Sequence, residues 1–448
     1  MKARRYQLRK EAVGVVAHHP WVFRDHLSSA AGALHDGEWL RLVDGQNRVV
    51  GYGIYAAEGA IAIRVLRRGA EVPDAAFLRA RIGAALSRRG PLAAKTDGIR
   101  LLNGESDSIP AIVADRFGDA IVVSSYASGA DALARYVARY LAAIAHRKPI
   151  GRGKSGATAT AAITDEMRRV VGPATSIVLE RAQRRHAAHA DHAANAHVDH
   201  AANADADHAA NADADAAARE LDAAPSDHAA PRALFGTPPA LGHFTEDGLT
   251  FSVDLATGQK TGAYLDLRGL RRMIATAPLS GARVLNLFAY TGMLGRAAEA
   301  AGAAHITEVD ASAPALAFAA AHHAADPAKH EYVIADIFEW LATHDGTYDL
   351  VIVDPPAMTS RAAQVPAVLA AYRKLFRAAA PRVRHGGALV AACCTSRIPR
   401  AQFQETVVRA LGTEFGRERE LPVELDHPVG FPQADYLKIG WYRRAQSS

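Results

Sequence analysis

Five short apolar runs in the carboxy-terminal half alternate with helix-length segments, and this alternation constrains the fold more than any other feature of the sequence. The runs lie at residues 284–288, 306–309, 332–335, 350–353 and 388–392. Such alternation is typical of a parallel sheet with helices on both faces, which binds ligands at the carboxyl ends of its strands. We therefore predict a doubly wound, Rossmann-like α/β domain over residues 236–448, with one crevice at these strand ends.

The residues that follow the first three runs suit a nucleoside cofactor. Gly292 follows the first run and allows the backbone to approach a ligand at the start of a helix. Asp310 ends the second run, where a carboxylate can accept hydrogen bonds from two ribose hydroxyls. Asp336 ends the third run, where a carboxylate can receive an adenine amino group. A single strand-end aspartate is more often a turn or helix cap. Because Asp354 ends a further run, three such acids after one glycine turn favour a cofactor site.

The glycine turn also indicates which cofactor. A dinucleotide-binding fold would carry the pattern G-x-G-x-x-G after its first strand. This chain has Ala289-Tyr-Thr-Gly-Met-Leu-Gly295 there instead. S-adenosylmethionine has no pyrophosphate and needs fewer glycines, so the turn favours a methyltransferase over a dehydrogenase.

A carboxylate and a thiol follow the last two runs. The fourth run ends in Asp354-Pro-Pro356, and Cys393 and Cys394 follow the fifth. The sheet would bring both groups to one crevice, which is what nucleophilic attack on a pyrimidine ring requires. A thiolate that adds to C6 of cytosine activates C5 toward a methyl group. Protonation or a hydrogen bond at N3, for which Asp354 is the candidate, would stabilise the charge that develops. The alternative, two buried thiols that only pack, stays open.

The composition indicates where such a protein works. The chain of 448 residues has 2 cysteines, too few for a disulfide framework. Its first residues lack the apolar core of a signal peptide, and no apolar run reaches the roughly eighteen residues of a membrane span. We expect a cytoplasmic protein that does not bind membranes.

The amino-terminal half predicts two smaller domains. Short alternating segments separated by Gly and Asp turns predict a small β-barrel over residues 1–72. Residues 73–147 predict an α+β domain. Its expected elements are a helix over 75–89, two strands within 112–123 and a closing helix over 130–145.

Basic residues are concentrated at the amino end, where they can attract phosphate backbones. The net charge of +5 is modest, but Arg4, Arg5, Arg9 and Lys10 lie within the first ten residues. A solvated basic face explains this concentration equally well. Trp21 and Phe23 have the chemistry to stack on bases, although a place in the core of a small barrel is favoured.

Residues 148–235 differ in composition from the rest of the chain. Alanine-rich repeats with a period of eight residues, such as Asp191-His-Ala-Ala-Asn-Ala-His-Val198, match neither helical nor heptad packing. We expect a low-complexity, disordered insertion, and no functional metal site in its histidines. Gly153-Lys-Ser155 is not a phosphate-binding loop, because Lys148 occupies the position of the required glycine.

Several motifs together resemble the bacterial 23S rRNA cytosine-C5 methyltransferases. The motifs are Asn286-Leu-Phe-Ala-Tyr-Thr-Gly292, Asp354-Pro-Pro356, Cys393-Cys-Thr395, Gly258-Gln-Lys-Thr-Gly-Ala-Tyr-Leu-Asp-Leu-Arg268, Asp426-His-Pro428, Phe431-Pro-Gln-Ala-Asp-Tyr-Leu-Lys438, His19-Pro-Trp-Val-Phe23 and Asn103-Gly-Glu-Ser-Asp107. The resemblance covers residues 1–147 and 236–448. It implies a PUA-type RNA-binding barrel, a central α+β domain and a class I methyltransferase domain that uses S-adenosylmethionine.

The resemblance also implies roles for single residues. Cys394 would be the nucleophile, because the thiol of this family occupies the middle of a small–Cys–small triplet, and Asp354 would assist it. The expected cofactor contacts are Phe288, Tyr290, Thr291, Gly292, Asp310, Asp336, Asp354 and Pro355. Expected RNA contacts are Arg4, Arg5, Arg9, Lys10 and Lys260. The expected partner is 23S rRNA or a precursor of the large ribosomal subunit.

Two other functions remain open at this point. The same fold could methylate another base atom, such as guanine N7 or an exocyclic amine, or the chain could be a non-catalytic RNA-binding factor in ribosome assembly. Ala357-Met358 and Met293 depart from residues common in the family. The base that removes the C5 proton and the oligomeric state, with a homodimer among the alternatives, are not determined by the sequence.

Overall fold

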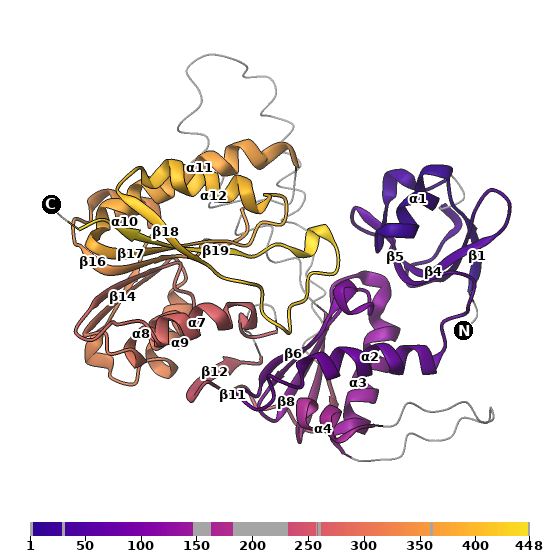
Figure 1. Ribbon diagram of the computed structural model, residues 1–448. Coiled ribbons are helices and arrows are strands. Elements are labelled where there is room, and N and C mark those ends of the chain that lie inside the picture. Colours follow the sequence, from indigo (N-terminus) through magenta and orange to yellow (C-terminus); the bar gives the residue numbers. More distant parts are fainter. Residues whose placement is uncertain are drawn as a thin grey trace.

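The computed structural model describes residues 3–28, 32–146, 163–181, 232–256, 258, 261–358 and 362–446. They form an amino-terminal domain, a central domain beside it and a larger carboxy-terminal domain on the other side (Figure 1). The N and C ends lie on opposite sides of the molecule in this view (Figure 1). None of the described helices is both long and apolar enough to cross a membrane.

The amino-terminal domain is a five-stranded sheet in the order β1-β3-β4-β5-β2. Its elements are β1 (Arg4–Gln7), α1 (Lys10–His18), β2 (Trp21–Phe23), η1 (Arg24–His26), β3 (Trp39–Val43), β4 (Val49–Tyr55) and β5 (Ile61–Arg68). The alternating segments of the sequence are the strands β3, β4 and β5. Helix α1 was not anticipated, because only Ala12 and Val16 of its short apolar stripe are buried.

The central domain contains the predicted helix 75–89 and the two predicted strands. Its first elements are α2 (Ala75–Arg89), β6 (Gly98–Asn103), η3 (Gly104–Asp107), β7 (Ile112–Phe117), β8 (Ala120–Ser125), η4 (Ser128–Ala130) and α3 (Asp131–Ala145). Contrary to expectation, α3 does not close the domain. The sheet order is β10-β9-β8-β7-β6, so strands from beyond residue 147 complete it.

The described parts of residues 148–235 therefore differ from the expected disordered insertion. They form α4 (Asp165–Val171), β9 (Ser176–Arg181) and β10 (Arg232–Phe235). The side chains of Ile177 and Val178 in β9 are fully or almost fully buried. The neighbouring alanine-rich repeats dominate the composition of this region and obscure the short apolar run of β9. The repeats, their histidines and Gly153-Lys-Ser155 lie outside the described residues.

A hairpin joins the central domain to the carboxy-terminal domain. Strands β11 (Leu241–Glu246) and β12 (Leu249–Asp254) pair in antiparallel fashion from Leu241↔Asp254 to Glu246↔Leu249. Phe244 of the hairpin packs on Phe117 of β7, with ring centroids 5.8 Å apart. Burial of large aromatic surfaces contributes several kcal/mol. The hairpin thus anchors one domain on the other.

The carboxy-terminal domain is the predicted doubly wound sheet, with strand order β15-β14-β13-β16-β17-β19-β18. Its strands are β13 (Arg283–Leu287), β14 (His305–Asp310), β15 (His330–Ile334), β16 (Tyr348–Val353), β17 (Val383–Cys393), β18 (Phe415–Glu420) and β19 (Lys438–Arg444). Its helices are η5 (Leu265–Leu267), α7 (Arg268–Ala275), α8 (Met293–Ala300), α9 (Ala313–His322), η6 (Pro327–Lys329), α10 (Ile337–Thr343), η7 (Ala362–Gln364), α11 (Val365–Ala379), η8 (Ala380–Arg382), α12 (Arg400–Leu411) and η9 (Pro432–Ala434).

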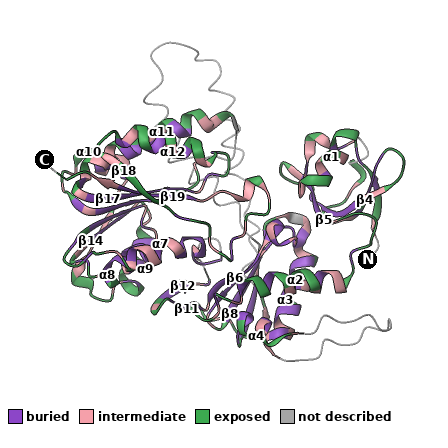
Figure 2. Ribbon diagram, in the orientation of Figure 1, coloured by how far each residue is buried: buried purple, intermediate pink, exposed green. Residues whose placement is uncertain are grey.

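Helices cover both faces of this sheet. One apolar core lies under α10, α11 and α12, and a second lies under α7 and α8. Figure 2 shows the strands buried between helices whose outer surfaces are exposed. The chain passes from β13 to β14 on one side, whereas β16 lies on the other side of β13. The carboxyl ends of β13 and β16 are therefore the switch point where a doubly wound sheet binds its ligand.

Candidate active site

The turn after β13 has an unusual backbone. Phe288, Tyr290 and Gly292 have positive φ angles of 60°, 50° and 72°. Non-glycine residues rarely adopt this region, and such strain tends to occur at ligand-binding sites. A Cβ atom at position 292 would lie 2.8 Å from the Cβ atom of Ala319, so the turn and α9 approach too closely for a larger residue. The turn lies at the carboxyl end of β13, at the switch point of the sheet.

Asp310 and Asp336 lie at the same edge of the sheet, because Asp310 of β14 pairs with Ile334 of β15. The Asp310 carboxylate accepts hydrogen bonds from the backbone N–H of Tyr290 and of Ser312, each at 2.8 Å. Asp336 caps α10 by accepting from the N–H of Phe338 at 2.8 Å. Both acids thus shape the local backbone. A carboxylate has about four acceptor positions, so this role and ligand binding are compatible.

A buried polar group below the turn was missed by the sequence analysis. Asn286 of β13 donates a hydrogen bond to Glu308 of β14 at 2.7 Å, and His330 of β15 lies 3.7 Å from the same carboxylate. Burial raises the pKa of Glu308 above its usual value, although His330 and Asn286 act in the opposite direction. A polar residue in the middle of an apolar strand was the available signal. These side chains link the three strands that carry the turn and its acids.

The structure brings Cys394 to the turn that contains Asp354. Strands β16 and β17 are parallel neighbours with Val353 opposite Ala391, so their carboxyl ends lie side by side. The half-buried Cys394 points its thiol at the backbone carbonyl of Pro355, with 3.6 Å between sulfur and oxygen. The thiol therefore lies next to Asp354-Pro-Pro356, at the carboxyl ends of two neighbouring parallel strands.

Cys393 lies in a different environment. Its side chain is fully buried in the core under α11 and α12, and its sulfur accepts a hydrogen bond from the Thr395 N–H at 3.4 Å. Thiols in such surroundings behave as small apolar residues. The two adjacent cysteines therefore differ, because Cys393 is fully buried and Cys394 is half-buried.

Aromatic and acidic side chains surround Cys394. The rings of Tyr264 and Tyr290 meet edge to face at 5.5 Å, and the Tyr436 hydroxyl donates to Asp266 at 2.6 Å. Burial raises the pKa of Tyr264, and the charges of Tyr290, Cys394, Asp266 and Asp354 add to this effect. The turn after β13, the Cys394 thiol, Asp266 and Asp354 thus all lie near Tyr264. The sequence predicted no separate role for Tyr264, Asp266 and Tyr436, which are parts of longer motifs.

The basic residues of the amino end share one cavity. Arg4, Arg5, Arg9 and Lys10 are exposed and line a hollow of about 870 Å³ on the amino-terminal domain. Arg4 is 3.4 Å from Glu38, and Arg5 donates to the side chain of Asn47 at 2.7 Å. Lys260 lies outside the described residues.

Trp21 connects domains and, like Phe23, is only half-buried. Val22 between them belongs to the buried core of the amino-terminal domain, so the favoured core position of the two aromatic residues was wrong. The Trp21 indole N–H donates to Glu105 of the central domain at 2.9 Å. Its ring packs edge to face on Phe431 of the carboxy-terminal domain at 4.7 Å. The indole of Trp21 thus joins the amino-terminal domain to both other domains.

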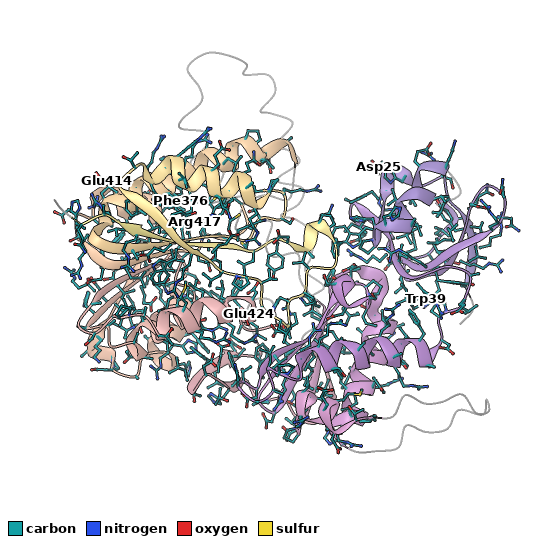
Figure 3. All side chains as sticks on the ribbon, in the orientation of Figure 1. Asp25, Trp39, Phe376, Glu414, Arg417 and Glu424 are labelled. Carbon is teal, nitrogen blue, oxygen red and sulfur yellow. The ribbon has the colours of Figure 1, made fainter. Side chains whose placement is uncertain are left out.

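Phe431 belongs to a segment that contacts all three domains, residues 424–436 between β18 and β19, which we name the strap. Figure 3 shows Glu424 near the middle of the molecule. Asp426 of the strap accepts from Arg268 at 2.8 and 2.9 Å, and Gln433 lies 2.8 Å from His19 of the amino-terminal domain. Gly430 donates to Ser106 of the central domain at 3.2 Å. The strap ends at Tyr436, beside the crevice.

Comparison with known proteins agrees with this architecture. Residues 8–68 match the model of a PUA-like domain, and residues 206–438 match that of the S-adenosylmethionine-dependent methyltransferases. A ribosomal RNA large subunit methyltransferase of Deinococcus radiodurans is 31% identical over 94% of this chain and 92% of its own length.

The chain belongs to this family of S-adenosylmethionine-dependent methyltransferases. A ribosomal RNA large subunit methyltransferase I of Serratia proteamaculans is 27% identical, with 98% of each chain covered. A methyltransferase structure from Streptococcus mutans superposes with a TM-score of 0.70 and 18% identity over 98% of this chain and 100% of that chain. A methyltransferase structure containing S-adenosylhomocysteine has a TM-score of 0.70 and 19% identity, over 98% of this chain and 100% of that chain. These matches confirm the predicted fold class, a PUA-like domain ahead of a class I methyltransferase domain.

The cofactor of the family is S-adenosylmethionine, and the groups at the carboxyl ends of β13, β14 and β15 have the chemistry to bind it. The positive-φ turn leaves no room for a Cβ atom at Gly292, and two acids stand at the ends of the next two strands. Among the residues that the structure describes, no group of His, Cys, Asp and Glu side chains could hold a metal ion.

Proposed function

We propose that this methyltransferase transfers a methyl group to C5 of a cytosine in large-subunit (23S) rRNA, through a covalent bond between Cys394 and C6. The observation that carries the proposal is the position of the Cys394 thiol, 3.6 Å from the Pro355 carbonyl oxygen at the neighbouring carboxyl ends of β16 and β17. Methylation of an exocyclic amine or of guanine N7 needs no thiol there. The relatives named as ribosomal RNA large subunit methyltransferases support rRNA as the substrate.

The proposed C5 methylation proceeds in steps that use Cys394, S-adenosylmethionine, a base and Asp354. The Cys394 thiolate adds to C6, and the electron pair of the C5–C6 bond becomes available at C5. C5 then takes the methyl group that S-adenosylmethionine supplies, leaving S-adenosylhomocysteine. A base removes the C5 proton, and elimination restores the C5–C6 double bond and releases the thiolate. Asp354 at N3 stabilises the charge that develops during the C6 attack.

Direct product analysis tests the proposal. The purified protein, S-adenosylmethionine with a labelled methyl group and unmodified 23S rRNA should yield labelled 5-methylcytidine. Nuclease digestion followed by mass spectrometry identifies the nucleoside and its position in the RNA. Labelled 7-methylguanosine or an amine-methylated nucleoside would reject the C5 reaction. Binding of rRNA without any methyl transfer would instead support an assembly factor.

Asp310 gives the clearest test of the cofactor site. We propose that Phe288, Tyr290, Thr291, Gly292, Asp310, Asp336, Asp354 and Pro355 form this site. Asp310→Asn removes the charge that orders the turn through the Tyr290 N–H. Hydrogen bonds to charged groups contribute about 1.5–3 kcal/mol, so the affinity for S-adenosylmethionine should fall roughly 10- to 100-fold in calorimetry. The exposed Asp326, which caps η6, provides the matched control Asp326→Asn, whose affinity should not change.

RNA binding by the amino-terminal domain predicts a specific salt response. We propose that Arg4, Arg5, Arg9 and Lys10, together with Lys260, contact RNA phosphates. Replacing Arg5 and Lys10 with glutamine removes two exposed cations from the cavity. The slope of log Kd against log salt should become shallower by about 1.4 to 1.8, because each phosphate contact contributes about 0.7 to 0.9. An unchanged slope in filter binding with 23S rRNA would exclude this surface as an RNA-binding site. Arg409→Gln on α12, outside the cavity, is the control.

A further inference from the structure

A buried lysine lies behind the loop that carries Cys394. Lys438 begins β19 and stands directly opposite Cys393 of β17. The residue is only 2% exposed. Its ammonium group donates to the backbone carbonyl of Thr395 at 2.9 Å and to that of Tyr436 at 3.1 Å. Lys438 therefore holds the residue that follows Cys394 and joins it to the end of the strap.

The position of this ammonium group is costly. Removing a cation from water costs several kcal/mol unless a negative charge compensates it. The nearby carboxylate of Asp435 is bound to Arg400 at 2.6 Å, and Arg400 also contacts Glu420 at 2.8 Å. Burial lowers the pKa of Lys438, and the charges of Cys393, Asp435 and Cys394 act in the opposite direction. Cys394 is thus one of the groups whose negative charge would favour the ammonium form of Lys438.

We propose that Lys438 is a positioning residue that fixes the Cys394 loop and favours the thiolate form of Cys394. The inference rests on the proposed function, in which Cys394 must lose its proton before it attacks C6. Attraction between an ammonium and a thiolate stabilises both charged forms, because each lowers the cost of the other. The hydrogen bond to the Thr395 carbonyl also fixes the backbone that follows Cys394, whose thiol lies 3.6 Å from the Pro355 carbonyl oxygen.

The other ionisable groups near Cys394 include acids and tyrosines, whose charges do not stabilise a thiolate. The charges of Asp266 and Asp354 act on the neighbouring Tyr264, and negative charge in this region opposes a thiolate. The pKa values of Tyr264, Tyr372 and Tyr436 are raised by burial, so these hydroxyls stay neutral at neutral pH. Tyr290 faces Tyr264 from the cofactor turn. Arg100 acts on Tyr436 but is bound to Asp115 at 2.9 Å. Lys438 supplies positive charge, and so does Arg400, which is bound to Asp435 and Glu420.

The rate of thiol alkylation measures this effect without methyl transfer. The chain has 2 cysteines, so Cys393→Ala leaves Cys394 as its single thiol. In this background, iodoacetamide alkylation is followed from pH 6 to pH 10. Lys438→Gln keeps hydrogen-bond donors but removes the charge. It should move the midpoint of the pH profile upward by about one unit and slow alkylation about tenfold at neutral pH. Lys438→Arg keeps the charge and should restore most of the rate.

The variants separate the inference from the proposed function. Lys329→Met removes a half-buried lysine of η6, between α9 and β15, and should leave the profile unchanged. An unchanged profile in folded Lys438→Gln would overturn the inference, and Lys438→Met provides the same measurement if the glutamine variant does not fold. Loss of turnover in Cys394→Ala together with an unchanged profile would leave the C5 mechanism intact. Full turnover in Cys394→Ala together with a shifted profile would reject that mechanism and keep the role of Lys438.

Discussion

Replacing Cys394 with alanine should reduce methyl transfer to rRNA at least about 10³-fold, because removal of an attacking nucleophile costs several orders of magnitude. The half-buried thiol touches the Pro355 carbonyl and fills no deep core, so the variant should fold normally. Its affinity for S-adenosylmethionine, measured by calorimetry, should stay close to that of the wild type. Loss of turnover with retained cofactor binding would identify a chemical defect.

Cys393→Ala is the matched control for this experiment. The adjacent thiol is completely buried in the core under α11 and α12. Its removal should lower stability by about 1 kcal/mol and leave turnover within a few-fold of the wild type. The reverse result, with Cys393→Ala inactive and Cys394→Ala active, would exchange the roles of the two cysteines. Full activity of both variants would reject a covalent mechanism.

Asp426→Asn should lower the free energy of unfolding by about 3 kcal/mol, because it leaves the buried Arg268 guanidinium without its principal counter-charge. Asp426 is fully buried and binds Arg268 through two hydrogen bonds of 2.8 and 2.9 Å. It also accepts from the Arg100 N–H at 2.9 Å. Glu246 and Glu424 each lie 3.3 Å from Arg268, so part of the charge stays compensated. The expected loss is therefore at the lower end of the range for a broken buried pair. Urea unfolding at pH 7 measures it.

The pH dependence identifies the source of this stability. Burial alone would raise the pKa of Asp426, but the charges and hydrogen bonds of His427 and Arg268 hold it well below its usual value. A lowered pKa in the folded state stabilises the protein above the pKa of the unfolded chain, about 3.9, and this stabilisation is lost as the pH falls toward the folded value. The gap between wild type and Asp426→Asn should thus be constant above about pH 5 and narrow below about pH 4. A gap that does not depend on pH would contradict the ionic origin.

Glu418→Gln provides the comparison on the surface. Glu418 also binds an arginine through two contacts, 3.0 and 3.1 Å from Arg443, but the two side chains are about 40% exposed. Exposed ion pairs contribute at most about 1 kcal/mol. A loss for Glu418→Gln as large as that for Asp426→Asn would show that burial is not the deciding factor.

The sequence predicted the parts of the fold that depend on local periodicity. Runs such as 350–353 are apolar throughout, because strands of a parallel sheet are covered on both faces. The position of the acids followed from the rule that parallel strands end at one edge. Short or atypical helices and strands lack this periodicity of apolar residues. Helix α1 buries two residues, and β9 lies next to a long segment of a different composition.

The parts that the sequence did not predict depend on partners far apart in the chain. His19 and Gln433 are 414 residues apart, and Arg268 and Asp426 are 158 apart. Such pairs cannot be predicted from a local sequence pattern, since each residue taken alone would be predicted to be a polar group on the surface. The same holds for Lys438. A lysine in a sequence is expected to be exposed, whereas this one is buried in the folded chain. Chemical roles that arise from burial appear only in the folded chain.

The strap has a consequence for how this architecture can change over evolutionary time. Its Phe431 and Gln433 fit Trp21 and His19 of the amino-terminal domain, and the same segment ends two residues before Lys438. An exchange of the amino-terminal domain for another RNA-binding domain would remove these partners and disturb the segment next to the thiol. Replacement of the barrel must therefore be accompanied by matching replacements in the strap. Among related sequences, we expect positions 21 and 431, and positions 19 and 433, to vary together.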